Sequence, residues 1–198
     1  MTDKLTDTEK KQLADLIAAK TGRVPFKTGM AGVKAAPLPF YKNARKVDVK
    51  CFTTRPIITK EYVCDGETVF EIDGEEDTLR EMNDAFSLML GADNIAAYLA
   101  FYFDAVAAVN DDFARLVSSA DDFVTASFDA ELAQSLKKLV APPEIAERDD
   151  GGFSAKVFLL YDDVLFYNTL FLSPNGEVRV ENESVAYDCL PIRRIMLR

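Results

Sequence analysis

One apolar segment holds the side chains with the clearest potential for binding chemistry, because every residue from 95 to 109 is apolar or aromatic except Asp104. In a helix Asp104 lies six positions after Tyr98 and two after Tyr102, so neither phenol meets its carboxylate at the spacing of three or four that brings side chains together. A buried carboxylate without a partner is costly, so Asp104 must reach the surface, pair with a cation or serve a pocket. We take Tyr98, Tyr102 and Asp104 as candidate ligand-binding residues, with an ion pair or an exposed Asp104 as the simpler interpretation. The conceivable cationic partners are Arg55, Arg115 and Lys156.

Histidine is absent from the 198 residues, which removes several chemistries at once. Ser-His-Asp and Cys-His catalysis, His-ligated zinc or iron and a His ligand to haem are all excluded. The three cysteines, Cys51, Cys64 and Cys189, are odd in number and widely spaced, which argues against a disulfide framework or a thiolate zinc site. We expect small buried thiols in a reducing cytosol, no metal and no cofactor.

Two other patterns resemble sites but are better explained as local structure. Residues 29–34 read Gly-Met-Ala-Gly-Val-Lys, yet Val33 separates the second glycine from Lys34 and no hydroxyl follows, so the segment is not a phosphate-binding loop. Adjacent acids could bind Mg²⁺ or Ca²⁺, but no spaced calcium-loop pattern occurs and each pair sits where turns and helix caps use aspartate. These pairs are residues 75–76, 111–112, 121–122, 149–150 and 162–163.

The net charge of −10 is unevenly distributed. Residues 20–50 carry eight Lys or Arg against the single acid Asp48, while residues 61–131 carry eighteen acids against two arginines. The basic stretch also holds aromatic side chains that could stack on bases, so contact with nucleic acid through residues 20–50 is one alternative function. Because the molecule as a whole repels phosphate and no nucleic-acid fold signature is present, we expect a solvated basic edge and no nucleic-acid partner.

The elements that must position these groups begin with a helix. Thr6 and Glu9 match a capping box, and Gly22 ends the pattern. Residues 23–39 are rich in Gly, Pro and Lys and predict a loop. Alternating residues from 40 to 73 predict strands, with Asp65-Gly66 at a hairpin turn.

Helical spacing predicts helices over 78–90, 95–109 and 129–140, with Asp77 or Thr78 capping the first and Ser127 or Asp129 the last, and the pattern continues through Phe113, Leu116 and Val117. A mobile loop is expected at 144–152. Strands are then expected over 153–161, 164–173 and 177–183, with a fourth over 185–192. The run 164–172 is apolar on both faces and should be central in the sheet.

This order of elements favours an α+β fold over a doubly wound parallel sheet. We predict an antiparallel sheet built from early strands and a C-terminal meander, with a central group of helices packed on one face. The chain is expected to form a single α+β domain, 1–198. Its parts are a peripheral helix (1–22), a loop (23–39), strands (40–73), helices (77–140) and an antiparallel meander (153–192).

The apolar helix 95–109 also bears on assembly. Fifteen residues span about 22 Å, too short for a bilayer core of about 30 Å, so no membrane partner is expected. A helix apolar on every side must be buried on every side, and a second copy is the simplest source of the missing cover. We therefore predict a homodimer with residues 95–109 in the interface or directly beneath it.

The functional expectation follows from what is missing. We predict a non-enzymatic ligand-binding or protein-interaction module, with an unknown small molecule or protein as partner. The alternative is an enzyme that uses carboxylate, lysine or tyrosine groups in a pocket lined by the aromatic helix 95–109. The polar first residues show no apolar signal segment, so a cytoplasmic location is expected.

Overall fold

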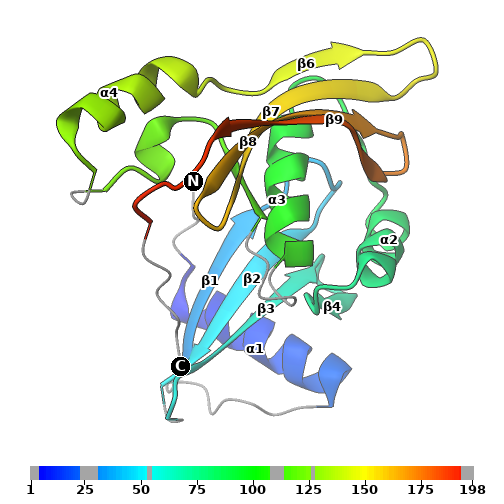
Figure 1. Ribbon diagram of the computed structural model, residues 1–198. Helices are drawn as coiled ribbons and strands as arrows, with labels where there is room; N and C mark the ends of the chain where they lie inside the picture. The colour runs from blue at the N-terminus through cyan, green and yellow to red at the C-terminus, as the bar shows by residue number, and fades with distance from the viewer. Residues whose placement is uncertain (1–4, 23–30, 53–54, 108–113, 126–127, 193–198) are drawn as a thin grey trace. The chain divides into compact units, whose positions relative to one another are not determined.

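The chain divides into two compact units, Met1–Met89 and Leu90–Arg198, which are described separately below. A computed structural model describes residues 5–22, 31–52, 55–107, 114–125 and 128–192 (Figure 1). The single domain stays a prediction. The α+β class is confirmed, with helices and two antiparallel sheets among the described residues.

The first unit begins with α1, Asp7–Thr21. The predicted capping box is present: the Glu9 amide donates to Thr6 Oγ1 (3.3 Å) and the Thr6 amide donates to Glu9 Oε2 (2.8 Å). Gly22 follows with φ 64°, a left-handed conformation that glycine adopts without strain and that commonly ends helices. The fully buried Ile17 then anchors α1 in an apolar cluster with the first sheet.

Four antiparallel strands form the first sheet in the order β1-β2-β3-β4. Their bounds are β1 Ala31–Pro37, β2 Arg45–Cys51, β3 Ile58–Cys64 and β4 Val69–Glu71. The predicted loop 23–39 is wrong over residues 31–37, which form β1. Small residues obscured the alternating pattern of this strand, in which Val33 and Ala35 are buried against α1. Its first part, 23–30, lies outside the described residues.

The predicted hairpin at Asp65-Gly66 joins β3 to β4, through a four-residue loop rather than a tight turn. Asp65 Oδ1 accepts hydrogen bonds from the amides of Glu67 and Thr68, both at 2.9 Å, and these bonds close the turn. After β4 comes α2, Glu76–Ala85, which ends well before the predicted residue 90. The two predicted caps of α2 are wrong, since Glu75 precedes the helix and Asp77 and Thr78 lie inside it.

The second unit contains the predicted meander. The strand order is β5-β7-β8-β9, with β6 also paired to β7, and every pair is antiparallel. The bounds are β5 Ala114–Val117, β6 Glu144–Glu147, β7 Phe153–Tyr161, β8 Val164–Leu172 and β9 Val178–Tyr187. β8 has a strand on each side, as its apolar residues predicted.

Two sheets replace the one sheet that the sequence predicted for early strands and meander. In the first sheet every strand pairs with its neighbour in sequence, and in the second the meander β7-β8-β9 does the same. Local pairing closes short loops, which costs less chain entropy than joining strands on either side of α2 and α3.

Three further boundaries differ from prediction. Leu116 and Val117, predicted to continue a helix, lie in the strand β5, because their backbone pairs with β7. Phe113 lies outside the described residues. β6 occupies the start of the predicted mobile loop 144–152, since it pairs with the first half of β7. β9 runs on to Tyr187, with register shifts beside Leu165 and Thr169 in its partner strand, so no separate strand starts at 185.

The helices of the second unit are α3, Ile95–Ala107, and α4, Ala130–Leu139. α3 is not buried on all sides as expected: Tyr98 and Leu99 are fully buried, but Ala97, Ala100 and Asp104 are exposed. This exposed face is tolerable because alanine places little apolar area in water. None of the described helices is long and apolar enough to cross a membrane.

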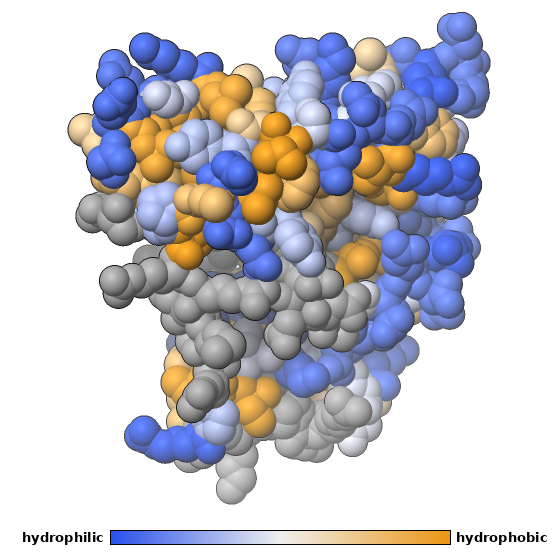
Figure 2. All heavy atoms as spheres, viewed as in Figure 1, coloured by the Kyte–Doolittle hydropathy of each residue, from blue (hydrophilic) through white to orange (hydrophobic). Residues whose placement is uncertain are grey.

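α4 begins at the predicted cap Asp129, whose Oδ1 accepts from the Leu132 amide at 2.8 Å, while the other candidate, Ser127, lies outside the described residues. Its fully buried Leu136 belongs to a core shared with Val117, Phe158 and Leu165 from three strands. In Figure 2 apolar side chains also reach the surface over α4 and the strands beside it, among hydrophilic ones.

Candidate functional site

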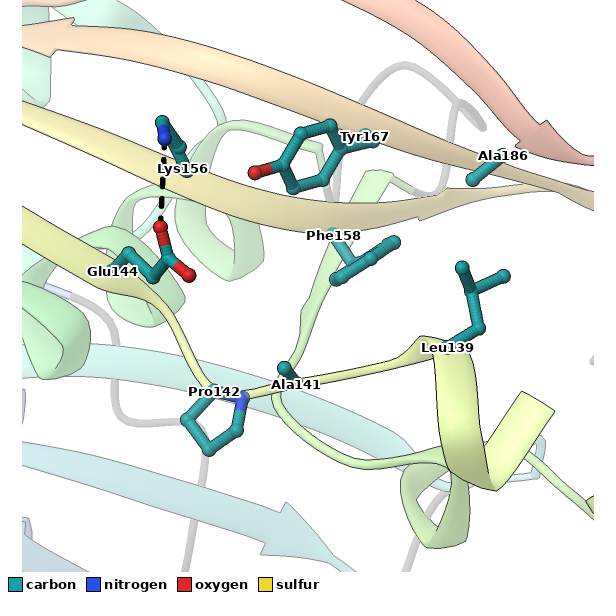
Figure 3. Close-up of a pocket in the computed structure, with 8 residues that line it drawn as sticks. All are labelled: Leu139, Ala141, Pro142, Glu144, Lys156, Phe158, Tyr167 and Ala186. Carbon is teal, nitrogen blue, oxygen red and sulfur yellow. Dashed lines mark ion pairs between the residues drawn. The ribbon is translucent and has the colours of Figure 1, made fainter. Parts of the chain in front are cut away.

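A pocket of about 350 Å³ opens between the end of α4 and the second sheet (Figure 3). Five secondary-structure elements and one connecting segment contribute to it. Its lining residues are Leu139, Ala141, Pro142, Glu144, Lys156, Phe158, Tyr167 and Ala186. The pocket lies wholly within the second unit.

The end of α4 forms one wall because two prolines prevent the helix from continuing. Val140 has an extended backbone (φ −78°, ψ 125°), and its amide still donates to the Leu136 carbonyl at 2.9 Å. Pro142 and Pro143 follow, and proline cannot supply the amide that a further turn requires. As a result Leu139 is left at the rim, 40% exposed, rather than in the core.

Two aromatic side chains form the floor. Phe158 and Tyr167 are directly opposite on β7 and β8, with ring centroids 5.0 Å apart and planes inclined by 46°. Phe158 is 7% exposed, so its edge faces the cavity while its body belongs to the core. Such a cross-strand aromatic pair presents a preformed apolar surface to any occupant.

Three polar groups lie at the other end of the cavity. Glu144 and Lys156 are opposite on β6 and β7, and Glu144 Oε2 lies 3.6 Å from Lys156 Nζ. In Figure 3 the Tyr167 hydroxyl points toward this ion pair. Within the described parts of the chain that hydroxyl has no hydrogen-bond partner. The pocket thus has an apolar end and a hydrogen-bonding end.

The polar groups are largely in water. The side chains of Lys156 and Glu144 are 54% and 72% exposed, and an exposed pair of this kind contributes about 0–1 kcal/mol to stability. Catalytic acids and bases usually need burial or nearby charges that shift their pKa values. Here solvent screens both Lys156 and Glu144. The arrangement can orient a ligand, and it lacks the enclosed setting typical of catalysis.

The structure brings two of the three predicted site residues together and places Asp104 apart from them. Tyr98 and Tyr102 share a face of α3, with ring centroids 6.5 Å apart, and the buried Tyr98 hydroxyl donates to the Gly176 carbonyl at 2.7 Å. At 100° per residue Asp104 lies about 200° around the helix from Tyr102, and it is exposed. Their role in ligand binding stays a prediction.

Two of the three candidate partners of Asp104, Lys156 and Arg115, have other contacts. Lys156 pairs with Glu144, and Arg115 Nη2 donates to the Asp122 carbonyl at 2.7 Å. Sequence reasoning named Lys156 only in that context and missed the pocket. The sequence held one signal of the pocket. Lys156 stands between the apolar residues Ala155 and Val157, and this alternation indicates a strand position that faces solvent.

The chain has no match to a protein-family model, a curated protein or a solved structure. Its function is therefore argued from geometry alone.

Asp122 and Cys64 show how an acid and a thiol outside the pocket serve local structure. No three Cys, Asp or Glu side chains within those residues gather as metal ligands would. Asp122 Oδ2, from one of the acidic pairs, accepts from the amides of Ser118 and Ser119 at 2.8 and 2.9 Å. Burial, and then the charge of Asp65, raises the pKa of the Cys64 thiol, which makes it a poor nucleophile.

Proposed function

We propose that the protein is a non-enzymatic binding module that takes a small ligand with an apolar body and a polar end in the pocket of Figure 3. The observation that carries the proposal is an aromatic floor next to the Tyr167 hydroxyl, which has no hydrogen-bond partner among the described residues and lies beside Lys156 and Glu144. Few polar groups around an apolar cavity are typical of small-molecule sites.

The size of the pocket sets the expected affinity. At about 350 Å³ the pocket is near the small end of ligand sites, and it suits a fragment with one aromatic ring. Burying about 150 Å² of ligand apolar surface contributes about 4 kcal/mol, and a dissociation constant of about 1 mM corresponds to 4.1 kcal/mol. We therefore expect binding in the range of about 0.1–1 mM for such a fragment.

The enzyme alternative finds the predicted residue types but in a different place. A carboxylate, a lysine and a tyrosine meet in this pocket, on strands rather than on the helix 95–109. Because Lys156 and Glu144 are more than half exposed, neither has the desolvated setting that general acid–base catalysis uses. This exposure is our reason for proposing binding over catalysis.

The test uses 4-phenylbutyrate, an aromatic ring with a carboxylate end, and amide chemical-shift changes in the full chain. Shifts should cluster on β6, β7 and β8. Tyr167→Phe and Lys156→Gln should each weaken binding by about three- to tenfold, since each removes one polar contact. Lys138→Gln, an exposed change on α4 outside the pocket, is the control. Equal binding by all variants, or no binding at about 10 mM, would remove the proposal.

Assembly and location belong to the same proposal. We propose a homodimer in which α3 lies in or under the interface, supported by the small exposed side chains Ala97 and Ala100, which let another backbone approach closely. Ala100→Arg should then give a folded monomer in sedimentation. A parent chain that sediments as a monomer would contradict the proposed dimer.

A cytoplasmic location is supported by the buried free thiols of Cys51 and Cys64.

A further inference from the structure

Three large apolar side chains lie in water at the loop end of the β2–β3 hairpin in the first unit (Figure 1). Phe52 directly follows β2, Ile57 directly precedes β3, and Ile58 begins β3. Each of the three is between 45% and 59% exposed. Apolar side chains exposed singly are ordinary, but a group of them marks a surface that contacts something else. We call these three residues the hairpin end.

Basic side chains from several elements surround the hairpin end. Phe52 shares a small cavity with Lys10 of α1, Lys34 of β1 and Lys50 of β2. Arg55 belongs to the loop itself and is exposed. Long basic side chains can lay their apolar stems against neighbouring apolar groups and hold their charges at a distance from them. The apolar side chains therefore have cations beside them.

The acids beside these cations are fewer. Lys10 pairs with Asp7 at 3.1 Å, and Asp48 lines the same cavity as the three lysines. Lys34, Lys50 and Arg55 form no ion pair with any residue that the structure describes. The acids elsewhere that give the chain its net charge of −10 act weakly here, because physiological salt screens charges beyond about 8 Å. The local balance is therefore positive.

We infer that the hairpin end makes peripheral contact with an anionic lipid membrane. Its three apolar side chains enter the boundary between headgroups and acyl chains, and the cations lie at the level of the lipid phosphates. An apolar group with cations beside it matches the layers of such a membrane, in which negative headgroups lie directly above an apolar layer. The backbone of the loop prevents deeper entry, because amides and carbonyls there would lose water without gaining a partner.

Contact of this kind needs no membrane-spanning helix, so it differs from the membrane partner that the length of helix 95–109 argues against. It also goes beyond the proposed ligand pocket, which lies in the second unit. It agrees with the proposed cytoplasmic location, because the cytoplasmic leaflet carries anionic lipids. An acidic protein or a second copy of this chain would use the same groups, so the experiment must tell these occupants apart.

The exposed areas and charges set the expected strength of binding. Moving each half-exposed apolar side chain out of water strengthens binding about fivefold, and so does each cation held near an anionic membrane. Together these effects are somewhat weaker than one myristoyl chain, whose association constant is about 10⁴ M⁻¹. We therefore expect half-saturation at about 1 mM accessible lipid.

The absence of tryptophan from the chain allows a direct test. Ile57→Trp places the only indole of the full chain at the hairpin end. Val185→Trp is the matched control, because Val185 is 60% exposed against 56% for Ile57, and its nearest charged residues in sequence are Glu183 and Asp188. With vesicles of phosphatidylcholine and about one-third phosphatidylserine, the emission of Ile57→Trp should move to shorter wavelength and that of Val185→Trp should not. Vesicles of phosphatidylcholine alone should need at least about tenfold more lipid.

Sedimentation of the chain without tryptophan on the same vesicles gives a second measure. Ile57→Ser and Lys50→Gln should each weaken binding about fivefold. Val185→Ser and Lys138→Gln, an exposed lysine on α4, should leave binding unchanged. Thermal unfolding of each variant shows that it is folded.

Four results would overturn the inference. The first is no binding at about 10 mM anionic lipid, and the second is equal binding to neutral vesicles. The third is an emission shift of Ile57→Trp that follows protein concentration without lipid, which would assign the hairpin end to a second copy. The fourth is a shift with soluble polyglutamate as large as with vesicles, which would assign it to an acidic protein.

Discussion

The hydroxyl of Tyr98 is the contact whose removal the structure predicts most directly. Tyr98 is fully buried on α3, and its Oη donates to the carbonyl of Gly176, a buried residue in the turn between β8 and β9, at 2.7 Å. The substitution Tyr98→Phe removes one oxygen and keeps the ring. It therefore removes the contacts of the hydroxyl while the apolar packing of the ring is kept.

The expected cost comes from the carbonyl that is left behind. A typical intramolecular hydrogen bond contributes about 0.5–1.5 kcal/mol, and a buried acceptor left without a donor costs about 1–3 kcal/mol. The Gly176 carbonyl cannot be rescued by solvent, because the residue is buried. We expect Tyr98→Phe to lower the free energy of unfolding by about 1–2 kcal/mol, which is about 2–8 °C in melting temperature for a chain of this size.

Urea unfolding of the full chain measures this change, with the slope against urea concentration unchanged between variants. Tyr187→Phe is the matched control, because Tyr187 is 37% exposed and its hydroxyl has no hydrogen-bond partner among the described residues. Its free energy of unfolding should change by less than about 0.5 kcal/mol. A Tyr98→Phe chain as stable as the control would refute the reasoning. A stable variant that had also lost ligand binding would return Tyr98 to the candidate site of the sequence analysis.

Three further predictions concern local structure. Thr6→Ala should lower the free energy of unfolding, measured with urea, by about 1 kcal/mol. It should also raise the pKa of Glu9, measured by carboxyl NMR, part of the way back to its usual value, because the Thr6 amide and then the Thr6 hydroxyl hold that pKa low. The stability that Glu9 contributes is full above its unfolded pKa and is lost as pH falls through the lowered value. Alkylation followed by mass spectrometry should modify the exposed Cys189 long before Cys64, whose pKa burial raises, and equal rates would contradict that burial. Gly152→Ala should lower the free energy of unfolding by about 1–3 kcal/mol, because the new Cβ would lie 2.8 Å from a backbone oxygen. Thermal unfolding measures this change, and an unchanged melting temperature would show that the strands can separate there.

Local signals in the sequence predicted the fold where short-range chemistry determines it. The capping box at Thr6 and Glu9 and the two residues left between the predicted strands 153–161 and 164–173 each depend on a few neighbouring residues, and both are confirmed. The strand 153–161 was predicted with its observed bounds. Prediction was wrong at β1 and β5, where backbone pairing with another strand, β2 and β7 respectively, outweighs weak local preference.

The apolar helix shows why composition alone misjudges burial. Every residue of 95–109 except Asp104 looked apolar, but an alanine and a phenylalanine differ greatly in the area they must hide. α3 buries its large side chains, Tyr98 and Leu99 among them, and exposes Ala97 and Ala100. Weighting each position by side-chain area would have placed Asp104 on the exposed face.

The candidate pocket lay beyond sequence reasoning because a turn creates it. Glu144 and Lys156 are twelve positions apart and meet only because the loop 148–152 sets the register of β6 against β7. Slipping that register by one residue would move Glu144 to the opposite face, since side chains alternate along a strand. Gly152 belongs to this turn, where its carbonyl accepts a hydrogen bond from the Arg148 amide at 2.9 Å, and it packs so closely on β8 that a Cβ would lie 2.8 Å from the Leu172 carbonyl oxygen. The polar end of the pocket therefore depends on backbone geometry at the turn as much as on its own residues, so Gly152→Ala should reduce ligand affinity as well as stability.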